Sequence, residues 1–260
     1  MTRDAWVSTH PYLHSLADVD ALVERAAAQV AQPAVAAPDW NAYANDYYAG
    51  VPLLHSRKAA IDLSAPEEAV ESLIKMLASS STPGSVAEQC RALVAELPAG
   101  DLASSPQAGL FRYLLWAVLA RSLKPVVSAF DAWRNEERWL HNYCPTCGEP
   151  PAMAQLLGKD PGRLRKLSCG CCKTRWQYRR TGCPFCDSQD DEHRLTVVTV
   201  EGESGLRIDY CEACGGYLKT YDGEGHEHVM LADWTSLHLD FVARDRGLKR
   251  MAASLYDLER

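Results

Sequence analysis

The sequence predicts an α+β protein, in which an all-helical N-terminal domain is followed by two small metal-binding modules and a C-terminal helix. Three observations support this fold class. Nine of the ten cysteines lie between residues 144 and 214. Eight of these nine cysteines form four CxxC pairs, grouped two and two along the chain. After Tyr143, apolar residues at helical spacing give way to Cys, Gly, Pro and short β-prone runs.

The helical part is expected to hold several amphipathic helices. One is predicted between about residues 16 and 30, and a capping box, Ser64 to Glu67, predicts the start of another. A later helix is predicted to open at Ser105-Pro106 and to break or kink at Pro125. The aromatic-rich stretch 38–54 is expected to pack against this core and not to form a recognition surface.

Two further expectations concern Cys90 and the last helix of the chain. Cys90 falls on an apolar helical stripe, which predicts a buried small hydrophobe and not a metal ligand. A last helix is expected to start at Asp233 and to run through Leu237, Phe241 and Leu248.

Composition narrows the function classes. The chain has 260 residues, of which 47% are apolar and 23% charged, as is typical of a globular protein. The net charge of −7 argues against a general nucleic-acid binder, which needs basic contacts to phosphate. The sequence shows neither the pattern of a signal peptide nor an apolar run of the ~20 residues that a membrane span needs. We therefore expect a cytoplasmic protein without membrane insertion, whose thiols bind metal and do not form disulfides.

The four CxxC pairs predict two tetrahedral metal sites. A CxxC step in a tight turn places two thiolates on one side of a backbone knuckle, and two facing knuckles form an S4 cage for zinc or a single iron. The first predicted ligand set is Cys144, Cys147, Cys169 and Cys172, and the second is Cys183, Cys186, Cys211 and Cys214. Interleaved pairing, as in cross-braced modules, is the alternative. Cys171 is a ninth thiol, and the repeated spacing favours Cys169 as the ligand beside it.

The ligand type limits the chemistry. Hydrolytic zinc sites keep one position open for water, whereas cages of four cysteines are closed, so metal-assisted hydrolysis is not expected. Iron in such a cage could still transfer electrons, and spacing does not separate iron from zinc. His226 and His228 could hold a third metal, but no further ligand is spelled nearby and we expect surface histidines. His10 and His238 have no partner nearby in the sequence and are expected to be structural or solvated.

The two modules have net charges of opposite sign. Residues 144–182 carry eight basic and two acidic side chains, and residues 183–222 carry three basic and nine acidic side chains. Either the two modules neutralise each other, or a charged face meets a partner. A sharper version of the second interpretation is that Asp190, Asp191 and Glu192 hold a basic leader peptide of a client.

Several of these motifs resemble the formate dehydrogenase accessory protein (FdhE) family over most of the chain. The resemblance is carried by His10-Pro-Tyr-Leu13, Pro38-Asp-Trp40, Asp46-Tyr-Tyr, Gly50-Val-Pro-Leu-Leu54, Cys144-Pro-Thr-Cys-Gly-Glu-Pro-Pro151, Cys169-Gly-Cys-Cys172 leading to Trp176, Cys183-Pro-Phe-Cys186 and Cys211-Glu-Ala-Cys-Gly-Gly-Tyr-Leu-Lys219. The order of the four CxxC pairs, with the Trp after the second and Gly-Tyr-Leu-Lys after the fourth, makes it specific. Cys171 and the somewhat short chain depart from the pattern.

The resemblance implies two rubredoxin-like modules, each holding one iron or zinc ion on the eight matching cysteines. It also implies a non-catalytic accessory or maturation factor that contacts the catalytic subunit of formate dehydrogenase before export. The predicted division is a helical domain at 1–142, the two modules at 143–182 and 183–222, and a C-terminal helical segment at 223–260. The alternatives are a nucleic-acid-binding double zinc ribbon using Arg163, Arg165, Arg175 and Arg179, and a stand-alone rubredoxin-type electron carrier. The oligomeric state is left open.

Overall fold

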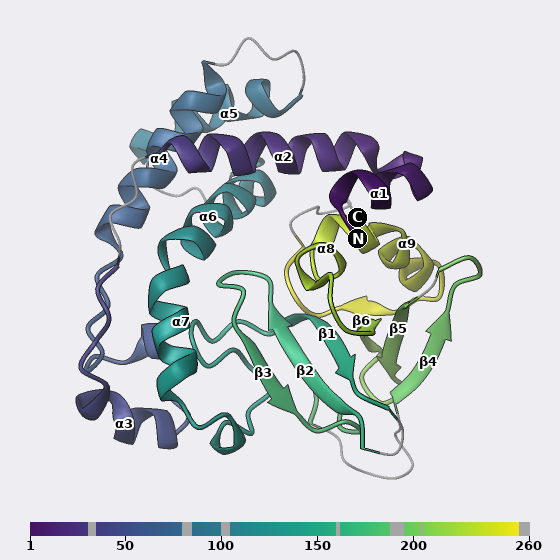
Figure 1. The fold of residues 1–260 in the computed structure, drawn as a ribbon. Helices are drawn as coiled ribbons and strands as arrows, with labels where there is room; N and C mark the ends of the chain where they lie inside the picture. Colours follow the sequence, from purple (N-terminus) through teal and green to yellow (C-terminus); the bar gives the residue numbers. More distant parts are fainter. Residues whose placement is uncertain are drawn as a thin grey trace.

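A computed structural model describes residues 1–30, 35–79, 85–99, 105–159, 162–187, 195–203 and 205–254. It confirms the α+β class, with a helical first half and a sheet that carries two clusters of four cysteines (Figure 1). No single helix within these ranges is long and apolar enough to cross a membrane, although the bent pair Ala108–Ser122 and Lys124–Trp133 passes that test when taken together.

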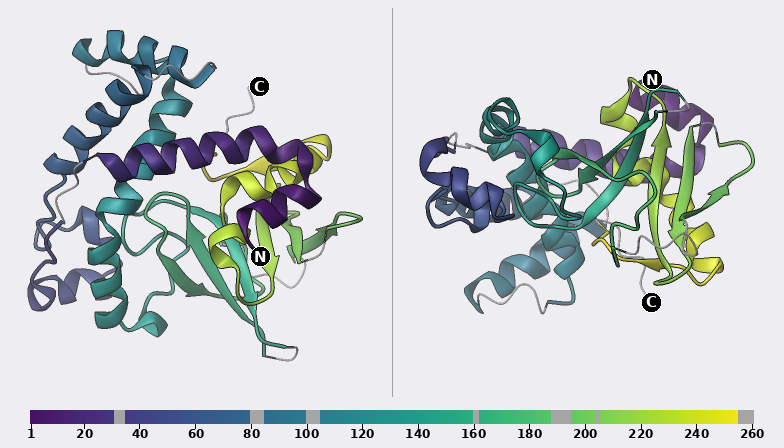
Figure 2. Two further views of the ribbon diagram at one scale, coloured as in Figure 1. Left: turned by 45° about the horizontal axis from the view of Figure 1, so that its top comes forward. Right: turned by 90° about the horizontal axis from the view of Figure 1, so that it is seen from below.

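The helical half contains two groups of helices. The first packs α2 (His14–Gln29), α4 (Ser64–Ala78), α5 (Ser85–Glu96) and α6 (Ala108–Ser122) around one apolar cluster. Cys90 is fully buried in this cluster, as expected, and burial raises the pKa of its thiol to about 11. In both views of Figure 2, α4 and α5 lie on the side of the molecule away from the strands of residues 195–222.

The second group packs α3 (Trp40–Tyr48) and α7 (Lys124–Trp133) against the first cysteine module. Tyr43 and Tyr47 are buried here, which confirms the packing role predicted for the aromatic stretch. Pro125 is the second residue of α7, which is bent by 56° from α6, as predicted, because proline removes a helical hydrogen bond.

Two helix boundaries differ from the prediction. Ser64 is not an N-cap but the first residue of α4, and Asp62 accepts the hydrogen bond from its backbone N–H instead. The last helix, α9 (Leu237–Asp245), is preceded by a 3-10 turn, η6 (Asp233–Ser236). It ends before Leu248, because Gly247 turns the chain at a φ of +71°.

The six longer strands form one sheet. Strands β1 (Pro151–Leu157), β2 (Leu164–Cys169) and β3 (Arg175–Tyr178) form one antiparallel half, and β4 (Leu195–Thr199), β5 (Leu206–Cys211) and β6 (Gly216–Asp222) form the other. Parallel pairing of β1 with β6 joins the halves in the order β3-β2-β1-β6-β5-β4, and the short β7 (Lys249–Arg250) pairs with β6. The sequence predicted each half but not this junction, in which each half covers an edge of the other.

The first helix, α1 (Arg3–Thr9), lies away from α4 and α5 but contacts α2, where Arg3 pairs with Asp20 and Glu24. It packs with α8 (Glu227–Met230) and α9 near β5 and β6, while α2 crosses from there to the helical bundle (Figure 1). The indole of Trp6 donates a hydrogen bond of 3.0 Å to the carbonyl of Thr235. The division into four parts proposed from the sequence stays a prediction, and the structure shows contacts that join its first and last parts.

Candidate metal centres

The structure brings together the sulfurs of each predicted ligand set. Within each set the four sulfurs lie within 4.8 Å of one another; the sets are Cys144, Cys147, Cys169 and Cys172 (the first site) and Cys183, Cys186, Cys211 and Cys214 (the second site). The grouping is sequential and not interleaved, and none of the ten cysteines is in a disulfide. Cys171 is buried beside the first site and belongs to neither group.

The knuckle geometry comes from local backbone structure. The N–H groups of Gly148, Asp187 and Gly215 donate to the carbonyls of the first cysteine in their respective pairs. In all four knuckles the residue after the second cysteine has a positive φ: +80° at Gly148, +63° at Lys173, +56° at Asp187 and +69° at Gly215. Only two of these four are glycine, so a left-handed turn closes each knuckle even where a side chain opposes it.

Sulfur separations fit a tetrahedral ion. The Sγ atoms of Cys144 and Cys172 are 3.4 Å apart, and those of Cys183 and Cys214 are 3.8 Å apart. A tetrahedron with metal–sulfur bonds of about 2.3 Å has sulfurs roughly 3.8 Å apart. Backbone N–H groups also point at the sulfurs, 3.4 Å from Thr146 N to Cys144 Sγ and from Phe185 N to Cys183 Sγ. Each group therefore could hold one metal ion.

The pKa values of the thiols also favour a bound metal ion. Burial raises the pKa of Cys144 well above the ordinary value and that of Cys183 to about 12. Four buried thiolates without a cation are therefore unfavourable, whereas a divalent or trivalent ion deprotonates all four and offsets their charge. With four sulfurs at each site, the donor set fits a closed structural or electron-transferring metal and leaves no position for a substrate water.

The first site lies inside the aromatic core of the molecule. Its surroundings include Trp116, Trp139 and Trp176, and only Cys147 of its four cysteines is partly exposed. The hydroxyls of Thr146 and Thr174, 2.7 Å apart, join its two knuckles.

A loop of the helical half closes over the first site. The backbone N–H of Leu53 donates to Pro145 O at 2.9 Å, and that of Leu54 donates to Thr146 O at 2.8 Å. His55 lies directly on Gly148. The first knuckle is thus held by a segment some ninety residues earlier in the sequence.

The second site lies at the surface. Cys186 is exposed and Cys214 is partly exposed, whereas Cys183 and Cys211 are buried. Phe185 and Met251 approach Gly216 beside this site. The acidic turn at Asp190, Asp191 and Glu192, for which a leader-binding role was predicted, lies outside the described residues.

The oppositely charged modules contact each other. Arg163 Nη1 lies 2.7 Å from Asp222 Oδ2, and Arg179 pairs with Asp187. Arg165 is buried instead of forming part of a basic face. These contacts support mutual neutralisation for the residues involved, because their charges are already paired or covered within the chain.

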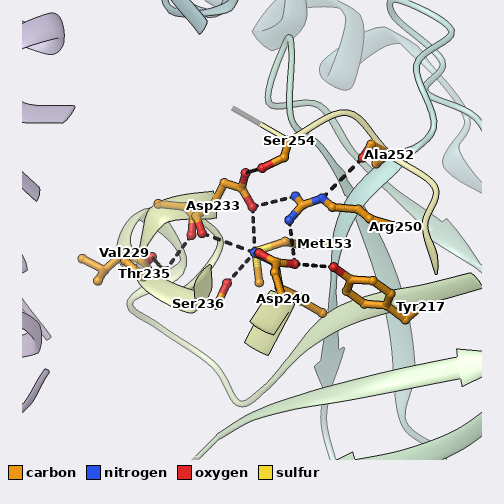
Figure 3. A network of polar contacts seen from close by, with 12 residues as sticks. Met153, Tyr217, Val229, Asp233, Thr235, Ser236, Asp240, Arg250, Ala252 and Ser254 are labelled. Carbon is orange, nitrogen blue, oxygen red and sulfur yellow. Dashed lines mark hydrogen bonds and ion pairs between the residues drawn. The ribbon is translucent and has the colours of Figure 1, made fainter. Parts of the chain in front are cut away.

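Sequence reasoning missed a buried ionic network in the second half of the sheet. Lys219 on β6 is 1% exposed, and its Nζ lies 2.7 Å from Asp233 Oδ1 and 2.9 Å from Asp240 Oδ2. Figure 3 shows Arg250 joined to both of these carboxylates and Tyr217 joined to Asp240. Burial alone would raise the pKa of Asp233, but Lys219 and Arg250 hold it far below its usual range. The Gly-Tyr-Leu-Lys motif was the available signal, since it supplies Tyr217 and Lys219.

The histidines have different environments. His226 and His228 are exposed, as expected. His10 and His238 are not solvated: their Nε2 atoms lie 2.9 and 3.1 Å from the same oxygen of Glu203. This carboxylate joins the start of the chain to α9. No local pattern in the sequence predicts this contact, because the three residues meet only through the tertiary fold.

Comparison with known proteins gives relatives of one kind. No protein-family model matches the chain. A protein FdhE homolog of Aquifex aeolicus is 32% identical over 144 residues, which are 54% of this chain and 50% of that protein. Homologs from Pseudomonas putida (32% identical, 59% of this chain and 46% of that protein) and Pseudomonas aeruginosa (33% identical, 43% and 38%) are also similar. The matches thus span about half, or less, of these curated relatives.

A solved structure is similar over nearly the whole chain. The crystal structure of the FdhE protein from Pseudomonas aeruginosa aligns with a TM-score of 0.61, covering 98% of this chain and 96% of that one at 24% identity. This likeness shows the fold, including the arrangement of helices and sheet described above.

Proposed function

We propose that the chain is a member of the FdhE family, which its relatives and its fold support, and that it is a non-catalytic accessory factor for formate dehydrogenase. In this proposal it acts in the cytoplasm, binds the catalytic subunit of that enzyme and is needed for its assembly into active enzyme. The resemblance of its motifs to the family supports this function. The observation that carries the non-catalytic part is that both clusters present four cysteine sulfurs and no open ligand position.

We further propose that the eight clustered cysteines bind two metal ions, iron or zinc, one at each site. Such an ion supplies folding energy, and iron would in addition supply one-electron chemistry. The chain's own contribution is the knuckle geometry, the aromatic enclosure of the first site and the exposure of Cys186 at the second. Anaerobic purification with metal analysis and a visible spectrum tests this proposal. Two metal ions per chain are expected, and fewer than two would contradict it.

Binding of the enzyme subunit has its own test. The tagged, metal-loaded full chain should retain the purified catalytic subunit of a formate dehydrogenase on an affinity column and should not retain an unrelated enzyme of similar size. Absence of retention at low salt, where charged contacts are strongest, would contradict the proposed partner.

A stand-alone electron carrier is the second candidate, and the exposure of Cys186 favours it because an exposed ligand shortens the path to a redox partner. Iron-loaded protein that turns over with a reductase would support this function, and a colourless, zinc-only protein would exclude it.

The nucleic-acid alternative is disfavoured because the arginines that it requires are already paired or buried within the chain. Arg163 pairs with Asp222, Arg179 with Asp187, and Arg175 donates to Gln155, while Arg165 is buried. A gel shift with duplex and single-stranded probes should therefore show no specific complex.

A further inference from the structure

Arg165 is a buried cation that the proposed function does not use. It lies on β2, opposite Leu156 of β1 and Tyr178 of β3, and only 1% of its surface is exposed. Arginine is rarely buried to this extent unless its charge is compensated, because removing a charge from water is costly. The burial of this side chain therefore requires a compensating group.

The visible contacts of Arg165 compensate it only in part. Its Nη2 donates to the carbonyl of Gly182, and its guanidinium lies 5.3 Å from the ring centroid of Tyr178. Its Nε and Nη1 are buried and have no hydrogen-bond partner within the described residues. Asp209 acts on it electrostatically, but that carboxylate already accepts hydrogen bonds from Arg207 and Thr220.

Both groups that Arg165 contacts belong to the wall of the second site. Gly182 directly precedes Cys183, the first cysteine of that site. The hydroxyl of Tyr178 lies 3.5 Å from Cys183 O and 2.8 Å from Asp187 Oδ1, at the two ends of the same knuckle. A negatively charged Cys183 also raises the pKa of Arg165, against the larger effect of burial, which lowers it to about 10.

The contacts of Arg165 lie beside the second site, although the residue belongs by sequence to the first module. Gly182 is the residue before Cys183, and the hydroxyl of Tyr178 reaches both ends of the Cys183–Cys186 knuckle. Arg165 is therefore joined to the backbone next to that knuckle.

We propose that Arg165 is a charge-compensating residue of the second metal site. Four thiolates around a divalent ion carry a net charge of −2, and those around a ferric ion carry −1. The buried guanidinium stabilises this anionic cluster at close range in a medium of low dielectric, and the cluster in turn compensates the guanidinium. The inference rests on the proposed metal binding and assigns a residue outside the ligand sets to the second site.

The test is a zinc-affinity measurement by chelator competition on the full chain, with Arg165→Met, Arg165→Lys and Arg163→Met as variants. Loss of an outer-shell partner lowers metal affinity by about 10- to 100-fold, so Arg165→Met should weaken one of the two sites by that factor. Arg165→Lys keeps the charge and should lose less. Arg163→Met removes a cation two residues away that pairs with Asp222, and it should leave both affinities unchanged.

A second background identifies the affected site. In Cys186→Ser, which removes a ligand of the second site, Arg165→Met should no longer change the affinity of the remaining site. With iron in place of zinc, Arg165→Met should lower the reduction potential of the second site, because a nearby cation favours the more negative ferrous state.

The outcomes separate the two proposals. Two zinc ions bound with unchanged affinity in Arg165→Met would overturn the role of Arg165 and leave the metal sites standing. Fewer than two zinc ions in the unmodified chain would overturn the metal sites themselves. If Arg165→Met does not fold, the test uses Arg165→Lys instead. The zinc affinity of its second site is expected to stay within about tenfold of that of the unmodified chain, and a larger loss would overturn the proposal.

Discussion

The two cysteine sites share one ligand plan but are stabilised by different parts of the molecule. The first lies in an aromatic core that also contains α3 and α7, and a loop of the helical half closes over it. The second has an exposed cysteine, Cys186, and lies in the half of the molecule that contains the buried charges of Lys219, Asp233 and Asp240. The difference indicates that the first site holds the fold together, whereas the second is available for exchange or contact.

Replacing one cysteine at each site should give the largest difference in structure between variants of the two sites. Cys144→Ser is expected to lose the first metal and to unfold much of the chain, because a structural metal contributes folding energy directly and this residue is fully buried. Cys186→Ser is expected to lose the second metal and to leave the helical content unchanged. Metal analysis and far-UV circular dichroism of the two purified variants check this. Equal loss of structure in both would contradict the asymmetry.

The buried charges of the second half give the next largest effect. Lys219→Met should lower the free energy of unfolding by about 3–5 kcal/mol, because it leaves two buried carboxylates with one fewer partner. The exposed pair of Lys75 with Glu71 provides the control, and Lys75→Met should cost less than about 0.5 kcal/mol. Urea unfolding at neutral pH measures both. A cost for Lys219→Met as small as that of the control would show that the network does not stabilise this half.

The same network predicts a pH dependence. The folded-state pKa of Asp233 lies far below its unfolded value of about 3.9, so its ionised form stabilises the folded state above that pH. This contribution is lost as the pH falls from about 5 through 4 and below. Asp233→Asn should therefore be less stable than the unmodified chain at pH 7, by about 3 kcal/mol, and the difference should narrow at acid pH. Most of the narrowing should occur below pH 4, so a difference that stays constant from pH 7 down to about pH 2 would contradict this assignment.

Two glycines, one in a knuckle of each site, allow a matched comparison with a smaller expected effect on stability. Both Gly148 and Gly215 have a positive φ, which costs a residue with a side chain about 1–2 kcal/mol. At Gly148 an added Cβ would also lie 2.6 Å from His55 Cε1, whereas at Gly215 it would meet nothing within 4 Å. Gly148→Ala should thus lower the melting temperature more than Gly215→Ala. Equal effects would show that His55 moves aside without cost.

Local chemistry explains which features the sequence could predict. The ligand sets follow from CxxC spacing, and the break at Pro125 follows from the missing N–H of proline. Burial of Tyr43 and Tyr47 follows from the apolar character of aromatic rings.

The features that were missed depend on contacts between distant segments. The junction of β1 with β6, the shared carboxylate of Glu203 and the burial of Arg165 each join parts of the chain that no local pattern relates. The early end of α9 at Asp245 was missed for another reason, since Gly247 was a local stop signal that the helical spacing of Leu248 outweighed in the prediction.

The rate of metal release tests the central claim most directly. Cobalt-loaded chain mixed with excess chelator should lose its two ions in two phases, with the ion bound through the exposed Cys186 leaving first and the enclosed ion at least about tenfold more slowly. Cys186→Ser should remove the fast phase alone. A single phase for both ions, or a fast phase that survives in Cys186→Ser, would contradict the distinction between an enclosed first site and an accessible second one.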